Sequence, residues 1–186
     1  MSLIEEISQA ILKEKGFHFR GIALGDSLDK VEALEGVDYE EVTGSLPHYE
    51  YYEEVGEAEE IQGYYKYEAA TKKVVEIQLF FYFYPKIYWE GKQEQDFWNL
   101  VQQGQLESLS PIFEEVKDKV VQELTHQLGP PKTSTQDTVF SPTPPSFEKW
   151  VWQSPQENLV VTSYVDDKTT SSIRQVLRLA LSSSYF

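Results

Sequence analysis

The side chains that most often carry chemistry are sparse in this chain. Its three histidines, His18, His48 and His126, form no HxH, HExxH or HxxxH arrangement, so the spacing that brings two imidazoles to one metal ion is missing. The chain has no cysteine, which excludes disulfides and metal sites built on thiolates. We therefore expect no metal and no other cofactor.

Other catalytic sites also lack their sequence signatures. Residues 21–27 link a predicted strand to a predicted helix, but they have neither the GxxxxGK[ST] nor the GxGxxG spacing of a phosphate-binding loop. No serine lies in a GxSxG elbow. Trp89-Glu90 and Asp96-Phe97-Trp98 place acids beside large aromatics, yet a general acid also needs an apolar cleft that raises its pKa. We predict that the protein is not an enzyme.

The most distinctive pattern is an acidic, tyrosine-rich segment at residues 35–60, with ten acids and no lysine or arginine. The acids are Glu35, Asp38, Glu40, Glu41, Glu50, Glu53, Glu54, Glu57, Glu59 and Glu60, and the tyrosines are Tyr39, Tyr49, Tyr51 and Tyr52. The net charge is −15, and residues 1–95 contribute −11 of it. Two interpretations stay open, because charge can simply protect an edge strand from aggregation, or it can attract a basic partner.

The second interpretation predicts a partner-binding surface. Its residues are Tyr49, Glu50, Tyr51, Tyr52, Glu53, Glu54 and Glu57. The tyrosines would anchor the contact, and the glutamates would mimic phosphates that a basic partner, such as a nuclease, normally binds. The leading hypothesis is therefore a non-enzymatic immunity or inhibitor protein that occludes its partner. A chain this acidic is not expected to bind nucleic acid, because phosphates would be repelled.

The hydrophobic pattern predicts the elements that hold this segment. In the first half we expect two helices, one over residues 3–11 that stops by Gly16 and one from residue 28 to Gly36. We expect a strand between them over residues 17–24, and three further strands over residues 49–55, 61–69 and 74–84. Leu28, Val31 and Leu34 are predicted to face inward from the second helix. Val75, Ile77, Leu79, Phe81 and Phe83 are predicted to share one face of the last strand.

The second half repeats this order. Residues 85–108 form a glutamine-rich connector. A helix then begins with Ser110-Pro111 and stops at Gly129-Pro130, carrying an apolar stripe of Leu109, Phe113, Val116, Val120, Leu124 and Leu128. A loop over 132–146 precedes strands over 147–153, 158–165 and 172–181.

These elements predict an α+β fold with two similar halves, each a helix followed by a three-stranded antiparallel sheet. We expect residues 1–186 to form one compact domain, with an acidic first half (1–95), the connector (85–108) and a second half (109–186).

Residues 21–36, GIALGDSLDKVEALEG, resemble the opening of the helix-plus-sheet modules of the outer-membrane assembly lipoprotein BamE and of beta-lactamase inhibitory proteins. The shared features are a strand that ends in glycine, a short helix with an inward valine and a closing glycine. The resemblance implies the same fold and a binding role. This chain departs from those families in having neither a lipid-anchor cysteine nor disulfides.

Two alternatives remain beside the inhibitor hypothesis. Twelve tyrosines, ten phenylalanines and four tryptophans could line a pocket of a small-molecule or carbohydrate-binding protein or enzyme. Trp150 and Trp152 share a strand face, as core residues or as a sugar platform. The chain could also be a structural or regulatory subunit. With no secretory signal and no apolar run long enough for a membrane helix, we expect a cytoplasmic protein without a membrane partner.

Overall fold

The computed structural model describes residues 12–13, 16–19, 21–36, 39–42, 48–54, 59–83, 99, 111–137, 146–166 and 174–183, and β3 and β4 are described by their backbone pairing. The elements in chain order are β1 (Leu12–Lys13), β2 (Gly16–Phe17), α2 (Leu28–Glu35), β3 (Tyr39–Val42), β4 (His48–Glu54), β5 (Glu59–Glu68), β6 (Lys73–Phe83), α5 (Pro111–Leu128), β7 (Lys132–Asp137), β8 (Ser146–Gln153), β9 (Glu157–Asp166) and β10 (Arg174–Ser183).

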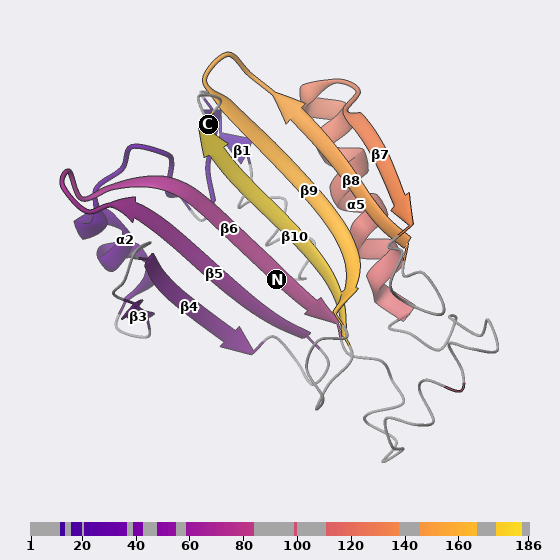
Figure 1. Ribbon diagram of the computed structural model, residues 1–186, viewed down its shortest axis with the longest axis horizontal. Coiled ribbons are helices and arrows are strands. Elements are labelled where there is room, and N and C mark those ends of the chain that lie inside the picture. The colour runs from indigo at the N-terminus through magenta and orange to yellow at the C-terminus, as the bar shows by residue number, and fades with distance from the viewer. Residues whose placement is uncertain are drawn as a thin grey trace.

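Eight strands of the described residues form one antiparallel sheet, in the order β3-β4-β5-β6-β10-β9-β8-β7 (Figure 1). Its centre is the pair β6 and β10, which come from opposite halves of the chain. Leu79 pairs with Leu179 in the middle of this contact. The predicted α+β class with an antiparallel sheet is therefore confirmed.

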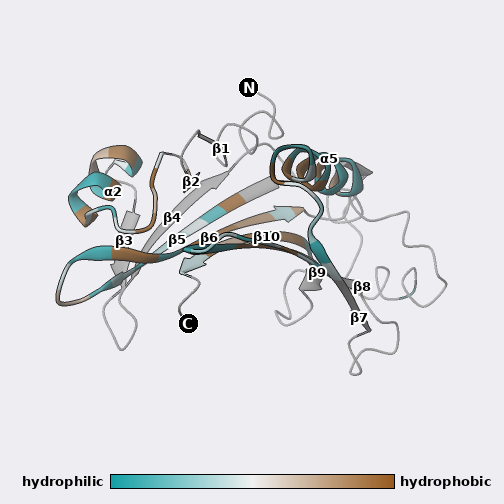
Figure 2. Cartoon of the chain, turned by 90° about the horizontal axis from the view of Figure 1, so that it is seen from above, coloured by the Kyte–Doolittle hydropathy of each residue, from teal (hydrophilic) through white to brown (hydrophobic). Residues whose placement is uncertain are grey.

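Both described helices, α2 and α5, lie on the same side of this sheet (Figure 2). The main hydrophobic core lies between them and the sheet. It includes Ile77, Leu79, Phe81 and Phe83 of β6, Leu177, Leu179 and Leu181 of β10, and Phe113, Val116, Val120 and Leu124 of α5. We call this side the helix-covered face and the opposite side the helix-free face. Figure 2 also shows β8 and β7 curving away from the side of the helices.

The predicted second helix is present, but one of its predicted inward residues is wrong. α2 ends before Gly36, whose φ of 79° suits glycine at a helix C-terminus. Leu28 and Val31 are buried as expected, whereas Leu34 is 51% exposed and Glu35 only 8% exposed. The helical period explains the difference, because positions 28, 31 and 35 lie on one stripe and position 34 lies beside it.

The predicted face of β6 is also corrected at one position. Ile77, Leu79, Phe81 and Phe83 are buried together, but Val75 is 37% exposed and Val74 is buried in its place. The pairing with β5 shifts between Lys66 and Tyr67. Such a bulge adds one residue to a strand and reverses which side its neighbours face.

Both halves contain a strand that the prediction omits. β3 precedes the three expected strands of the first half, and β7 occupies the start of the segment predicted as the loop 132–146. Both are edge strands. Their own sequences carry little apolar alternation, so their hydrogen bonds to β4 and β8 define them.

The start of the chain differs from the prediction as well. The helix expected over residues 3–11 lies outside the described residues, and Leu12-Lys13 pairs with Gly16-Phe17 as β1 and β2. The expected strand over 17–24 is instead a tight reversal in which the backbones of Phe19 and Ile22 exchange two hydrogen bonds of 2.8 Å. Gly21, at a φ of 85°, allows this turn.

The remaining elements agree with the sequence pattern. α5 begins at Pro111 and ends before Gly129, and its predicted stripe is buried at Phe113, Val116, Val120 and Leu124. Leu128 is 37% exposed, and Leu109 lies outside the described residues. Strands β4, β5, β6, β8, β9 and β10 match the six predicted strands to within about two residues at each end. Of the connector 85–108, the structure describes Asn99 alone.

Candidate protein-binding face

Six of the seven predicted partner-binding residues lie on β4, the neighbour of the edge strand β3. They are Tyr49, Glu50, Tyr51, Tyr52, Glu53 and Glu54, while Glu57 lies outside the described residues. β4 runs antiparallel to β5 over its whole length, from His48 opposite Lys66 to Glu54 opposite Glu60. Residues 48–54 of the acidic segment therefore belong to the sheet.

The pairing divides these six positions between the two faces of the sheet. Positions 49, 51 and 53 pair with Tyr65, Gly63 and Ile61, which are buried on the helix-covered face. Positions 50, 52 and 54 pair with positions 64, 62 and 60 of β5. Residues directly opposite in an antiparallel pair share a face, so Glu50, Tyr52 and Glu54 belong to the helix-free face.

An aromatic row continues the helix-free face beyond β4. Tyr64 of β5 meets Phe80 of β6 edge to face, with ring centroids 5.4 Å apart. Phe80 also lies near Tyr82, with centroids 6.0 Å apart and planes only 10° from parallel. The Tyr82 hydroxyl donates a 3.0 Å hydrogen bond to Gln62 Oε1. These contacts hold three half-buried or buried rings in a defined arrangement beside the acidic strand.

Beyond the aromatic row, the helix-free face carries positive charge. The guanidinium of Arg178 on β10 lies 5.5 Å from the centroid of the Phe80 ring, within the range of a cation–π contact. Arg178 pairs with Thr162 of β9, which in turn pairs with Lys149 of β8. The described side chains of this face are thus aromatic over β5 and β6 and basic toward β8, and positions 50, 52 and 54 of β4 continue the face by their backbone register.

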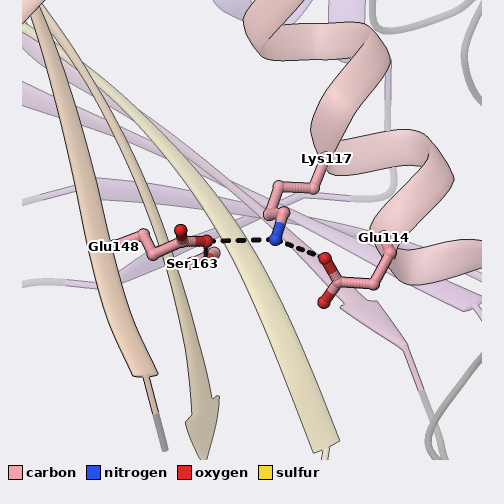
Figure 3. A network of polar contacts seen from close by, with 4 residues as sticks. All are labelled: Glu114, Lys117, Glu148 and Ser163. Carbon is pink, nitrogen blue, oxygen red and sulfur yellow. Dashed lines mark hydrogen bonds and ion pairs between the residues drawn. The ribbon is translucent and has the colours of Figure 1, made fainter. Parts of the chain in front are cut away.

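A polar network joins the opposite, helix-covered face to α5 (Figure 3). The Lys117 ammonium donates a 3.0 Å hydrogen bond to Glu148 Oε2 of β8 and also pairs with Glu114, one turn earlier in α5. The Ser163 hydroxyl of β9 donates to the same Glu148 oxygen at 3.4 Å. Burial alone lowers the pKa of Lys117, but its two carboxylate partners outweigh burial and raise the pKa above the usual 10.5. This network fixes the helix on the sheet.

The sequence pattern missed a second buried contact on the helix-covered face. Glu35, at the end of α2, accepts a hydrogen bond from the hydroxyl of Tyr65, whose side chain is fully buried in the core. From the sequence, Glu35 is one of the ten acids of the acidic segment and is not predicted to be buried. The i, i+3, i+7 spacing from Leu28 was the signal that could have identified its inward position.

Other residues with possible chemistry are dispersed or lie outside the described residues. The aromatic-flanked acids at Glu90 and Asp96 belong to the part of the connector that is not described. Trp152 is 4% exposed in the core, and Trp150 packs against that core. Among the residues that the structure describes, no three His, Asp or Glu side chains gather as metal ligands would.

Neither described helix is long and apolar enough to cross a membrane. In comparisons with protein-family models, curated proteins and solved structures, the chain matches none of them.

Proposed function

We propose that this chain is a non-enzymatic binding protein of the inhibitor or immunity kind, which occludes a basic partner with the helix-free face of its sheet. The observation that carries the proposal is the register of β4, which aligns Glu50, Tyr52 and Glu54 with the aromatic row of Tyr64, Phe80 and Tyr82. Tyr82 is only 5% exposed, so the half-buried rings of Tyr64 and Phe80 would supply the rigid contact area that aromatic residues give protein interfaces. The neighbouring carboxylates would meet the partner's cations.

The charge distribution supports a basic partner. Net charge is −15, and ten acids lie between Glu35 and Glu60 with no lysine or arginine among them. A surface of one charge sign accelerates encounters with a partner of opposite sign and discourages partners of the same sign. A partner that normally binds phosphates, such as a nuclease, fits this pattern. The encounter would take place in the cytoplasm.

The symmetry of the topology supports a wide docking face. α2 and α5 are each followed by four strands, and the sheet order is mirrored about the β6–β10 contact. We propose that the two halves are one helix-plus-sheet unit used twice, in line with the resemblance of residues 21–36 to modules of binding proteins. Joining two such units edge to edge leaves one broad face that neither α2 nor α5 covers.

The test is capture of basic proteins from the native host lysate at about 50 mM and about 500 mM salt, because salt screens exposed charge pairs over about 10 Å or less at 0.1 M and above. The double variant Glu50→Lys/Glu54→Lys is expected to abolish capture of a partner that the wild type retains at low salt. The control variant Glu115→Lys makes the same kind of charge change at an exposed position of α5 and is expected to retain the partner. Equal capture by all three proteins would contradict the proposal.

A further inference from the structure

Two polar side chains at the centre of the helix-free face have atoms that make no hydrogen bond. Thr162 is only 5% exposed, and its hydroxyl Oγ1 has no hydrogen-bond partner. The Nε of Arg178 is likewise buried and has none. Buried polar atoms are paired in the great majority of cases, so each of these two donors retains the capacity to bind an acceptor.

The register shows that these two groups belong to one site. Arg178 and Thr162 are directly opposite on β10 and β9, and directly opposed residues have Cβ atoms about 5 Å apart on the same face. The hydroxyl and the Nε–H therefore come from neighbouring positions of one face, with the guanidinium itself near the ring of Phe80 on β6. Lys149, directly opposite Thr162 on β8, adds a second positive charge to the same row.

The surroundings hold Arg178 in place, and no carboxylate among the described side chains forms an ion pair with it. Its guanidinium lies over Phe80, which is itself fixed between Tyr64 and Tyr82. Neither Arg178 nor Lys149 forms an ion pair with another residue in the described parts of the chain. Glu76, on the same face, is already paired with Lys66 at 3.0 Å. The row therefore presents positive charge with no carboxylate of its own.

We propose that Arg178, Thr162 and Lys149 form a binding site for one carboxylate group of the partner protein. A carboxylate has two oxygens in one plane, which suits an Nε–H donor and a hydroxyl donor side by side. A phosphate, with nearly twice the charge, would be opposed more strongly by the net charge of −15. β10 lies three strands from β4. The partner would therefore present a carboxylate about 14 Å from its cationic side chains that meet Glu50 and Glu54.

The claim that a carboxylate of the partner occupies this site rests on the proposed function. The binding of a carboxylate to the site can be tested on the isolated chain. The probe is sodium acetate, titrated against sodium chloride at constant ionic strength, and the readout is the NMR signal of the Arg178 Nε–H. We expect a saturable shift with a midpoint on the order of 10 mM acetate. Phosphate at equal ionic strength is expected to shift the signal less.

The variant Thr162→Val removes the hydroxyl with little change of shape. Because that hydroxyl has no partner in the free protein, the variant is expected to be at least as stable as the wild type, while acetate binding weakens about threefold to tenfold. Lys132→Gln is the matched control: it removes a positive charge from an exposed residue of β7, whose ammonium already donates to Gln153, and it is expected to bind acetate as the wild type does.

Each outcome decides between this site and the proposed function. An Arg178 signal that does not saturate with acetate, or a Thr162→Val variant that binds acetate as well as the wild type, overturns the site. Stronger binding of phosphate than of acetate overturns the assignment to a carboxylate. If acetate binds as expected but Glu50→Lys/Glu54→Lys captures proteins like the wild type, the proposed function fails and the carboxylate site stands.

Discussion

The hydroxyl of Tyr65 donates a hydrogen bond to the carboxylate of Glu35 inside the core. Tyr65 is fully buried on β5, and Glu35 is the last residue of α2. The contact therefore attaches the C-terminal end of a short helix to the sheet. Tyr65 also pairs with Tyr49, so the contact lies on the strand next to β4, which carries most of the predicted partner-binding residues.

Tyr65→Phe is expected to lower the free energy of unfolding by about 1–3 kcal/mol, because the buried carboxylate of Glu35 loses a donor. Urea denaturation measures the change. Glu35→Gln is the matched comparison, since its amide oxygen can still accept from Tyr65, and we expect a smaller loss. Equal stability of Tyr65→Phe and the wild type would contradict a role for this hydrogen bond.

Lys117→Met is expected to destabilise the protein by about 1–2 kcal/mol at neutral pH, because the carboxylates of Glu114 and Glu148 lose their ammonium partner. The folded pKa of Lys117 lies above the usual 10.5, so its contribution is complete below pH 10.5 and is lost as the pH rises through the folded pKa. Thermal unfolding of both proteins from neutral to strongly alkaline pH should show the deficit shrinking at the alkaline end. Lys119→Met, which breaks only an exposed pair within α5, is expected to cost about 0.5 kcal/mol or less.

Asp26 is expected to stabilise the turn before α2 in a pH-dependent way. Burial raises the pKa of its carboxyl, but hydrogen bonds from the Lys30 ammonium and the Ala23 backbone N–H outweigh burial and hold the pKa below 3.8. Its contribution is therefore present above pH 3.8 and is lost as the pH falls through the folded pKa. Asp26→Asn should cost about 1 kcal/mol at neutral pH, and its difference from the wild type should fade in acid.

Denaturation at a series of pH values measures this effect. Asp118→Asn, at an exposed position of α5, serves as a control and should change stability by about 0.5 kcal/mol or less. An Asp26→Asn deficit that is constant down to strongly acidic pH would contradict the assigned contacts.

Gly129 ends α5 at a φ of 81°, where its N–H donates to the Thr125 carbonyl and its own carbonyl accepts from Trp152 Nε1 at 3.0 Å. A Cβ at this position would meet no atom within 4 Å, so Gly129→Ala is expected to cost about 1–2 kcal/mol through backbone conformation alone. Gly129→Asn should cost less, because asparagine tolerates this conformation better. The measurement is the urea midpoint of each variant, and an equal loss for both substitutions would point to a steric cause.

Elements with a strong local pattern were predictable, and elements that depend on a neighbour were not. α5 has a proline at its first position, a regular stripe from Phe113 to Leu124 and a closing glycine, all of which are local signals. β7 has none of these, because its six residues KTSTQD are all polar. It is a strand because β8 offers unpaired backbone groups beside it.

The candidate face could be predicted only in part, for the same reason. The acidic, tyrosine-rich segment is visible in the sequence, and alternation along a strand implies that its members point to two sides. Which side holds the helices depends on how the core packs. The position of Arg178 over Phe80 was not predictable, because no local pattern relates residues of the two halves.

The sequence by itself determined the α+β class, the helices α2 and α5, six of the strands and the concentration of acid before residue 61, since these follow from local periodicity, turn residues and composition. Only the tertiary structure decided that β6 lies beside β10, that Glu35 is buried against Tyr65, and that the ring of Phe80 and the guanidinium of Arg178 share one face. Backbone hydrogen bonds between strands carry little sequence information. The strand order is therefore set by how all the apolar faces pack against the helices together, and no single segment specifies it.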